Sequence, residues 1–308
     1  MEPDISILRK TGHFYFALTV RGLTVLALRA EMKRGKEMIK QAAKKLFRSV
    51  GLDLRRVAPD ADAAEAAAKE AATRGSLRGA LRQLGKLGFR PRTVIDVGVA
   101  FETRELYEEF REAEILLIEP LAEFEPFLKK ICAEFKAQYA LAAAGEKSGT
   151  IALNVHKNQL DSSSLFREIE GAEVDGEPRE VPLVTIDETC AERGLAGPFL
   201  LKVDVQGAEL RVLSGAEQTL EQSEVVILEV TLFGTMIGGP QLADVVSFMR
   251  ERGFVVYDVW GMLYRPLDGA LAQVDMEFVR ADSVLRKEHG FATPEQRKSF
   301  AWKLQPQG

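Results

Sequence analysis

The chain has 308 residues, of which 46% are hydrophobic and 28% are charged, a composition ordinary for a globular protein. This length allows one large α/β domain with extensions, or two smaller domains. The formal net charge of −5 argues against nucleic acid as the main ligand, because the chain has no strong basic field to gather phosphates. The two cysteines, Cys132 and Cys190, form no CxxC pattern, and no two of the three histidines stand at metal-ligand spacing. Disulfide scaffolding and a metal site are therefore not expected, and a reducing, cytoplasmic location is favoured.

The first 74 residues differ from the rest and are expected to form an extension that contains a basic helix. Residues 14–30 are largely apolar, but this run is short for a membrane span of ~20 residues and is interrupted by Arg21. Residues 33–56 carry apolar residues at near-helical spacing among lysines and arginines. Such a helix could contact an anionic membrane surface peripherally, or pack its apolar stripe on the domain, and both readings stay open. The sequence also leaves open whether the protein begins at Met1 or at Met32.

From residue 61 onward, helical and strand patterns alternate along the chain. Helices are expected over 61–73, 75–87, 102–111, 121–135, 187–193 and 208–221, and strands over 93–97, 114–119, 137–142, 199–204 and 224–231. Such alternation predicts a parallel sheet covered by helices on both faces.

Two further segments depart from this alternation. Extended stretches at 151–155 and 179–186 are separated by a polar loop and form a hairpin-like interruption. Near the end, strands at 253–261 and 274–281 are joined by turn residues, which predicts an antiparallel pair at one edge of a mostly parallel sheet. The expected parts are an N-terminal extension over 1–74, an α/β domain with a Rossmann-like sheet over 75–290, and a tail over 291–308.

The most informative segment is LLKVDVQGAEL at 200–210. It reads as a buried strand with an acid at its tip, followed by the turn residue Gly207 and a helix. Asp204 and Gln206 are therefore expected at the carboxyl end of a parallel strand, where ligands bind in open α/β sheets. Asp204 also suits a plainer role, because an acid at this place can cap the helix that begins near Gly207.

A second segment, TVIDVGVAFET at 93–103, combines a strand, an acid, a glycine turn and the start of a helix, and Glu119 and Pro120 close the next strand. A glycine turn after one strand and an acid at the tip of the next are typical of nucleotide sites. The turn presents backbone N–H groups, and the acid accepts hydrogen bonds from ribose hydroxyls. Ala100 and Glu102 stand where a G-x-G-x-x-G fingerprint has glycine, so the dinucleotide signal is weak and Glu102 would oppose a pyrophosphate.

Five segments together resemble the FkbM family of methyltransferases: VIDVG at 94–98, LIEP at 117–120, SSSL at 162–165, LKVDVQGAEL at 201–210 and VVILEV at 225–230. The resemblance covers residues 75–285. It implies the Rossmann-like class I sheet of S-adenosylmethionine-dependent enzymes, with S-adenosylmethionine as cofactor. Typical members carry Glu in place of Gln206, and Gly in place of Glu102, so that Glu102 brings a carboxylate toward the cofactor's own carboxylate.

The resemblance also implies which residues surround the cofactor. They are Asp96, Gly98, Ala100, Glu119 and Pro120, with Glu119 on the ribose.

Methyl transfer to a hydroxyl requires a group that accepts the hydroxyl proton. Asp204, at the strand tip, is the first candidate for this base. Glu229 interrupts an apolar strand, and a buried acid must be partnered or protonated, so it is either a second catalytic candidate or a structural partner of a basic group. Glu209 stands in the first turn of the helix. It would orient the acceptor, pair with Lys202, or simply favour the helix dipole.

The segment NVHKNQLDSSSLF at 154–166 resembles the serine-bearing segment of the family. Ser162 and Ser163 are expected to bind polar groups of the acceptor, together with Gln206 and Glu209. His156 is a further candidate base, although a single histidine in such a loop more often has a structural role.

The leading hypothesis is therefore an S-adenosylmethionine-dependent O-methyltransferase that acts on a hydroxyl of a glycan or a secondary metabolite. Two alternatives remain. The first is a binding protein that keeps the fold but lacks transfer activity, motivated by Ala100 and Glu102. The second is a nucleotide-dependent, sugar-modifying oxidoreductase, which the poor glycine pattern and the closing antiparallel strands disfavour.

Overall fold

The structure, a computed structural model, describes residues 4–10, 13–20, 23–27, 75–171 and 174–294. The chain forms two compact units, residues 1–64 and residues 65–308. In the first unit, three strands pair antiparallel in chain order: β1 (Asp4–Lys10), β2 (His13–Val20) and β3 (Leu23–Ala27).

The described part of the N-terminal extension is thus made of strands, whereas the sequence suggested a helical extension. Aromatic and β-branched residues make up most of HFYFALTV, and LTVLA contains Thr24 and Val25; these residue types favour strands. The basic helix expected over 33–56 and the alanine-rich helix expected over 61–73 lie outside the described residues. The peripheral membrane contact proposed for the basic segment therefore stays a prediction.

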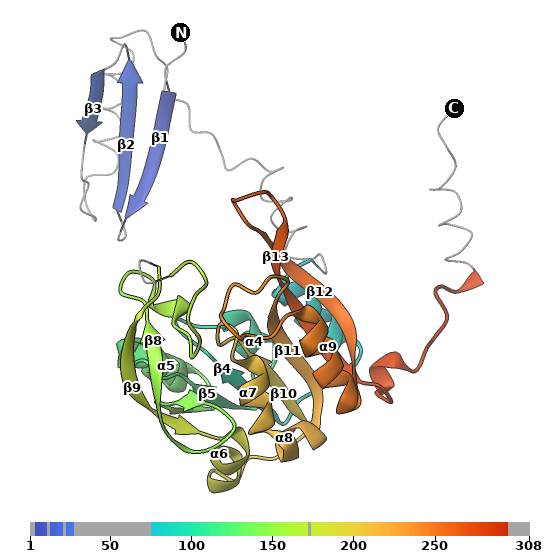
Figure 1. Cartoon of the computed structure of the whole chain (residues 1–308). Coiled ribbons are helices and arrows are strands. Elements are labelled where there is room, and N and C mark those ends of the chain that lie inside the picture. The colour runs from blue at the N-terminus through green and yellow to red at the C-terminus, as the bar shows by residue number, and fades with distance from the viewer. Residues whose placement is uncertain (1–3, 11–12, 21–22, 28–74, 172–173, 295–308) are drawn as a thin grey trace. The chain divides into compact units, whose positions relative to one another are not determined.

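The centre of the second unit is a seven-stranded sheet with the strand order β12-β13-β11-β10-β4-β5-β6 (Figure 1). Among these described strands, β13 runs antiparallel to its neighbours β11 and β12, and all other neighbouring pairs are parallel. The mostly parallel sheet with an antiparallel closing strand is therefore confirmed. The strands are β4 (Thr93–Val97), β5 (Glu114–Ile118), β6 (Ala137–Ala140), β10 (Phe199–Val203), β11 (Ser223–Thr231), β12 (Phe254–Tyr264) and β13 (Leu271–Arg280).

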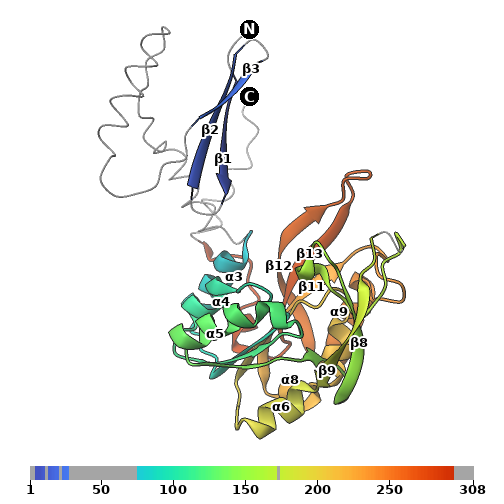
Figure 2. The ribbon, with the colours of Figure 1, turned by 90° about the vertical axis from the view of Figure 1, so that its left-hand side faces the viewer.

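Helices cover both faces of this sheet, as Figure 2 shows. One face packs against α3 (Leu77–Lys86), α4 (Arg104–Glu109) and α5 (Glu125–Glu134). The other face packs against α6 (Ile186–Glu192), α7 (Glu209–Ser214), α8 (Glu217–Glu221) and α9 (Leu242–Glu251). Alternate residues of each strand point to opposite faces, so β4 contributes Ile95 to one core and Val94 to the other.

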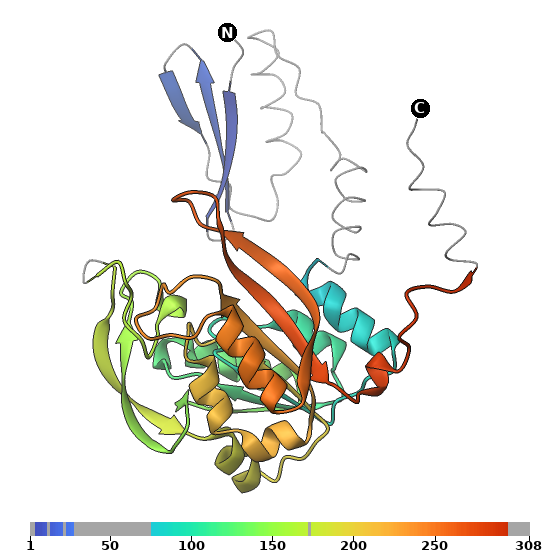
Figure 3. The same ribbon diagram turned by 45° about the vertical axis from the view of Figure 1, so that its right-hand side comes forward.

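Two structures extend beyond this central sheet. A small second sheet has the order β7-β9-β8, and the strands β12 and β13 continue past the sheet as a hairpin whose turn projects outward (Figure 3). The second sheet consists of β7 (Ala143–Ala144), β8 (Gly149–Val155) and β9 (Glu177–Val184). Short 3₁₀ turns lie at Ala122–Phe124, Leu160–Ser162 and Val284–Arg286.

The structure differs from the expected elements in two places. The single helix expected over 208–221 is interrupted at Gly215, where the chain passes so close to Gly145 that a Cβ would overlap the backbone oxygen of Gly145. The helix α9 was not anticipated, although Gln241 and Asp244 form a reciprocal capping box at its start. None of the helices in the described ranges is long and apolar enough to cross a membrane.

Candidate active site

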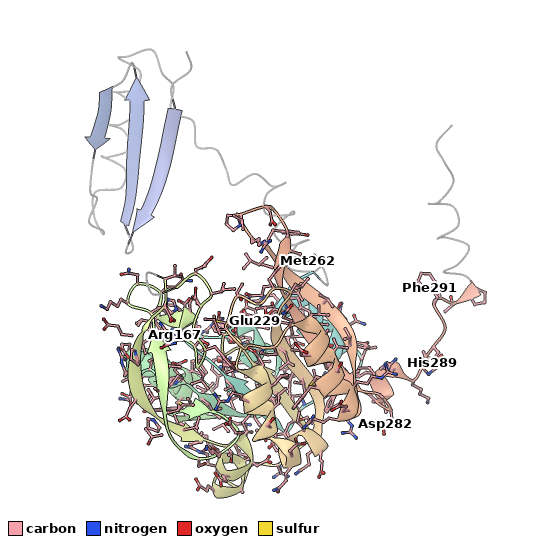
Figure 4. The ribbon with its side chains drawn as sticks, in the orientation of Figure 1. Arg167, Glu229, Met262, Asp282, His289 and Phe291 are labelled. Atoms are coloured by element: carbon pink, nitrogen blue, oxygen red, sulfur yellow. The ribbon has the colours of Figure 1, made fainter. Side chains whose placement is uncertain are left out.

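A cavity of about 640 Å³ opens at the carboxyl ends of β4, β5, β10 and β11, the edge where ligands bind in such sheets. In Figure 4, Arg167 and Met262 lie on either side of Glu229, which comes from β11. Nine of the residues expected from the sequence line the cavity: Gly98, Ala100, Glu119, Pro120, Ser162, Ser163, Asp204, Gln206 and Glu229. The other three, Asp96, His156 and Glu209, do not line it.

Glu119 follows β5 and is almost fully buried, with 4% of its surface exposed. Its Oε2 accepts a hydrogen bond from the Ala100 backbone N–H at 2.9 Å, and its Oε1 accepts one from the Leu121 N–H at 2.9 Å. Burial raises the pKa of Glu119, and these backbone donors oppose that rise. A carboxylate has about four acceptor positions, so these backbone donors leave acceptor capacity for a ligand hydroxyl.

The turn after β4 is shaped by Gly98 and Ala100. Gly98 has φ +79°, and a Cβ there would overlap the backbone oxygen of Asp204. Ala100 has φ +47°, a region that residues other than glycine seldom adopt. Its hydrogen bond to Glu119 holds it in this conformation. The turn therefore forms without the glycine that a dinucleotide fingerprint would place at Ala100.

Glu102 is an exposed residue at the rim of the cavity. Its carboxylate lies 3.5 Å from the Arg104 guanidinium and 3.8 Å from the Lys130 ammonium. Its charge is thus compensated by two cations from α4 and α5.

Asp96 lies below the cavity and not in it. It is 0% exposed, its Oδ2 accepts a hydrogen bond from the Tyr107 hydroxyl at 2.5 Å, and its Oδ1 lies 3.3 Å from the Lys202 ammonium. Burial and the neighbouring Asp96 charge raise the pKa of Tyr107 well above its usual value, so the hydroxyl remains a donor. The sequence-based assignment of Asp96 to the cofactor is therefore not matched by its position. All five β4 residues are buried, and the acid points toward a buried cation.

Lys202 was not singled out as a site residue by the sequence reasoning. It stands on β10 between apolar neighbours, lines the cavity, and bridges Asp96 at 3.3 Å and Asp204 at 3.4 Å. Burial alone would lower the pKa of its ammonium, but the two carboxylates outweigh this effect and raise it, so Lys202 stays charged. A lysine inside a buried strand was the signal for this role, because a buried charge requires a partner.

Asp204, Gln206 and Glu229 form one hydrogen-bonded group that faces the cavity. The Gln206 side-chain nitrogen donates to Asp204 Oδ1 at 3.2 Å and to Glu229 Oε2 at 2.9 Å. Burial raises the pKa of Glu229 to about 9, and the charges of Asp204, Glu209 and Asp275 add to this effect. Glu229 is therefore a neutral carboxylic acid near pH 7. Asp204 does not cap α7, because the N-cap residue of that helix is Ala208 and no side chain forms a capping hydrogen bond there.

Asp275, on β13, is a second residue that the sequence reasoning missed. It lines the cavity, and burial raises its pKa to about 6, with the charge of Asp204 contributing. No local motif marks it, because only the pairing of β13 with β11 brings it to the site.

Glu209 supports the loop beneath the site. Its Oε1 accepts hydrogen bonds from the backbone N–H groups of Val205 at 3.3 Å and Gly207 at 3.0 Å. Burial raises its pKa to about 7, and these N–H donors oppose the rise. It forms no pair with Lys202, which contacts Asp96 and Asp204 instead. The acceptor-binding role expected for Glu209 is therefore not supported by its position.

The serine segment brings Ser162 and Ser163 to the cavity wall. His156 turns away from it: its Nε2 lies 3.1 Å from Glu168 Oε1, while its backbone N–H donates to Ser163 Oγ at 3.2 Å. His156 thus acts in this structure as a support for the loop.

These residues fit S-adenosylmethionine. The cavity volume lies within the ~300–1,000 Å³ usual for small-molecule sites. A close-packed glycine turn stands at one end, and Glu119 offers carboxylate positions beside it. Within the described ranges, no set of His, Cys, Asp and Glu side chains is arranged to hold a metal ion.

The chain is similar to known methyltransferases in sequence and in structure. The chain is 32% identical over 116 residues to the 31-O-demethyl-FK506 methyltransferase FkbM of Streptomyces tacrolimicus; the match covers 37% of this chain and 42% of the relative, so less than half of that protein's length is spanned. Among solved structures it is similar to magnesium protoporphyrin IX methyltransferase of Synechocystis PCC 6803, with a TM-score of 0.38, 12% identity, and coverage of 82% and 100% of the two chains. It is also similar to the 1,6-didemethyltoxoflavin-N1-methyltransferase of Burkholderia thailandensis, with a TM-score of 0.35, 12% identity, and coverage of 92% and 100%.

Residues 96–256, just over half of the 308, match the methyltransferase FkbM domain. This match confirms the resemblance that the sequence motifs indicated. The chain belongs to the FkbM family of S-adenosylmethionine-dependent methyltransferases.

Proposed function

We propose that this methyltransferase transfers a methyl group to a hydroxyl of a glycan or a secondary metabolite. One observation carries the proposal: the Asp204 carboxylate and Glu119 line the same cavity from the ends of nearby strands. A base thus stands beside the expected position of the cofactor. The name of the Streptomyces relative, a 31-O-demethyl-FK506 methyltransferase, supports oxygen as the methyl acceptor.

The proposed reaction uses the residues of the cavity as follows. The bound cofactor supplies a methyl group on a positively charged sulfur. Asp204 accepts the proton of the acceptor hydroxyl as the oxygen takes the methyl group. Lys202 compensates the Asp204 charge from below at 3.4 Å, and neutral Glu229 offers its own proton to a neighbouring acceptor oxygen. Glu119 orients the cofactor ribose through its two carboxylate oxygens.

The borders of the cavity indicate the shape of the acceptor. Leu263, on the β12–β13 hairpin, lines the cavity and is still 55% exposed, and Leu267 at the turn is 83% exposed. Arg265 fixes this turn through an ion pair with Asp268 at 2.6 Å and through its stacking 3.9 Å above the Phe233 ring. An acceptor that joins an apolar body to hydroxyl groups would match these surfaces.

Calorimetric titration of the full chain with S-adenosylmethionine and, separately, with NAD tests the cofactor assignment against the oxidoreductase alternative. Binding of S-adenosylmethionine alone is expected. A protein that bound NAD and not S-adenosylmethionine at ~1 mM would overturn the proposal.

A screen for labelled methyl transfer then tests activity. The full chain is incubated with methyl-labelled cofactor and panels of hydroxylated glycans and secondary metabolites, and label uptake is expected in one panel. Binding of cofactor without uptake in any panel, including amine and thiol acceptors, would favour the alternative of a binding protein.

A further inference from the structure

Gln206 bridges two acidic residues in the wall of the cavity. Its single side-chain nitrogen donates to two different carboxyl groups, Asp204 at 3.2 Å and Glu229 at 2.9 Å. A primary amide has two N–H hydrogens on one planar nitrogen, so it satisfies two acceptors at once without adding charge. The Gln206 side chain is therefore a neutral bridge between two acidic side chains that line the cavity.

The backbone of Gln206 is held in an unfavourable conformation to place this amide. Its φ is +55°, in the left-handed region that is unfavourable for a residue other than glycine. Ser164, 1% exposed, donates from its Oγ to the Gln206 backbone oxygen at 2.6 Å. Gly207 follows with φ +95° and lies against Met236 and Phe166. Strain maintained by such surrounding contacts is typical of functional positions.

We propose that Gln206 is a positioning residue that holds Asp204 and Glu229 together as an acid–base pair facing the methyl acceptor. This inference rests on the proposed function for its catalytic meaning, but the pairing itself is a property of the protein alone. Asp204 then receives the acceptor proton, while Glu229 remains the neutral partner that donates to the acceptor.

The charges around Glu229 in this chain favour a neutral bridge. Asp204 and Lys202 face it from β10 and the loop that follows, Glu209 faces it from α7, and Asp275 faces it from β13. Three carboxylates and one ammonium already surround this group. An acid in place of Gln206 would add a fourth carboxylate and remove both donor hydrogens.

The test is a ¹³C NMR titration of carboxyl groups in the full chain, which requires neither cofactor nor acceptor. The Glu229 and Asp204 signals are assigned by their absence in Glu229→Gln and Asp204→Asn. Gln206→Met removes the donors while keeping an unbranched side chain, so the backbone strain at this position is unchanged. The charged form of Glu229 loses a stabilising hydrogen bond in this variant, so the pKa of Glu229 should rise by about one unit or more.

Gln206→Glu is the second variant, isosteric with Gln, and should raise the pKa of Glu229 beyond that seen in the parent. The matched control is the same pair of substitutions at Gln273, which lines the same cavity from β13 and makes no bond to either carboxyl group. The Gln273 variants should move the Glu229 titration by much less than the Gln206 variants.

Two outcomes decide the proposal. A Glu229 titration that is unmoved in folded Gln206→Met, or moved equally by the Gln273 controls, would overturn it. Shifts in the Gln206 variants alone would support it. Methyl transfer is measured separately: with an acceptor in hand, Gln206→Met should lower kcat with little change in the cofactor KM and should shift the alkaline pH limit of kcat. If the protein bound no cofactor while the carboxyl shifts were present, the proposed function would fail and the pairing would stand.

Discussion

Glu229 on β11 lies directly opposite Asp275 on β13 in the antiparallel ladder. Like charges in such a cross-strand position destabilise a sheet. The fold avoids this repulsion by protonation, since the pKa of Glu229 is raised to about 9 and that of Asp275 to about 6, by burial first and by neighbouring carboxylates second. The site therefore stores a proton that the unfolded chain would release.

A first prediction concerns stability against pH. The pKa of Glu229 is about 9 in the folded protein against an ordinary value of 4.5, and the pKa values of Glu209 and Asp275 are also raised. The folded state therefore binds more protons than the unfolded state. The free energy of unfolding should fall as pH rises from about 4.5 to about 9, by at most ~1.4 kcal/mol per pH unit for each group. Urea unfolding across this range measures it.

Glu229→Gln isolates the contribution of one group. The stabilisation from Glu229 protonation is fully present below pH ~4.5 and is lost by pH ~9, so the variant should show a flatter decline at neutral to alkaline pH. Glu251→Gln, on an exposed position of α9, serves as the control and should keep the parent slope. A parent protein whose stability rises between pH ~6 and ~9 would contradict the prediction.

Asp96→Asn should destabilise the fold without a specific effect on the cofactor. Asp96 is fully buried between Lys202 and Tyr107, and removal of one partner of a buried pair costs about 3–5 kcal/mol. Tyr107→Phe keeps the ion pair and removes one hydrogen bond to a charged acceptor, about 1.5–3 kcal/mol. Denaturant unfolding compares the two. An Asp96→Asn protein of parent stability with weakened cofactor binding would instead support a direct cofactor contact.

Asp204→Asn should preserve the fold and the affinity for S-adenosylmethionine and lower turnover by about 10²-fold or more, because Asn cannot accept the acceptor proton. Single-turnover kinetics with an acceptor from the methyl-transfer screen measure the effect. Asp161→Asn, which also lines the cavity, is the matched control and should lose far less. Near-normal turnover of Asp204→Asn would move the base to another group, with Glu229 the next to test.

Glu119→Ala should weaken cofactor binding by about 1–3 kcal/mol, the range for hydrogen bonds to a charged acceptor. Part of this loss comes from the turn, because Glu119 also holds the Ala100 and Leu121 N–H groups. Calorimetry at several temperatures measures the affinity. Glu123→Ala, an exposed acid nearby that pairs with Arg179, should bind as the parent does, and equal losses in both variants would remove Glu119 from the cofactor site.

Glu102→Gly should leave the cofactor affinity within about threefold of the parent value, since the carboxylate is exposed and paired with Arg104 and Lys130. Titration calorimetry of both proteins provides the comparison. A tenfold gain in affinity on substitution would mean that this carboxylate repels the bound cofactor.

The sequence predicted the sheet and the positions of Gly98, Glu119 and Asp204 because each depends on local order: a strand, its last residue and the turn that follows. The expectation that Asp96 lies at the cofactor did not follow from such local order. Its strand is buried on both faces, so alternation does not reveal toward which neighbour an acid points.

The roles of Asp275 and Lys202 depend on contacts between strands that are distant in the sequence. Asp275 enters the site through the register of β13 on β11, and Lys202 gains its role from Asp96 on the neighbouring β4. Strand register and cross-strand partners depend on residues far apart in the chain, so local patterns in a single sequence do not reveal them. The helix α9 differs from these two residues, because its capping box is a local pattern that the sequence alone displays.

The cavity takes its two ends from separate stretches of the chain. Its expected cofactor end comes from segments between Val97 and Ala144, whereas the opposite border comes from β8 and the segment 159–165, and from the β12–β13 hairpin. Both border pieces are hairpins, whose two ends return to adjacent points of the scaffold. Each hairpin can therefore be exchanged without changing the order of the parallel strands. If the proposed function holds, a chimera with the β12–β13 hairpin of another family member is expected to keep the cofactor and to methylate a different acceptor.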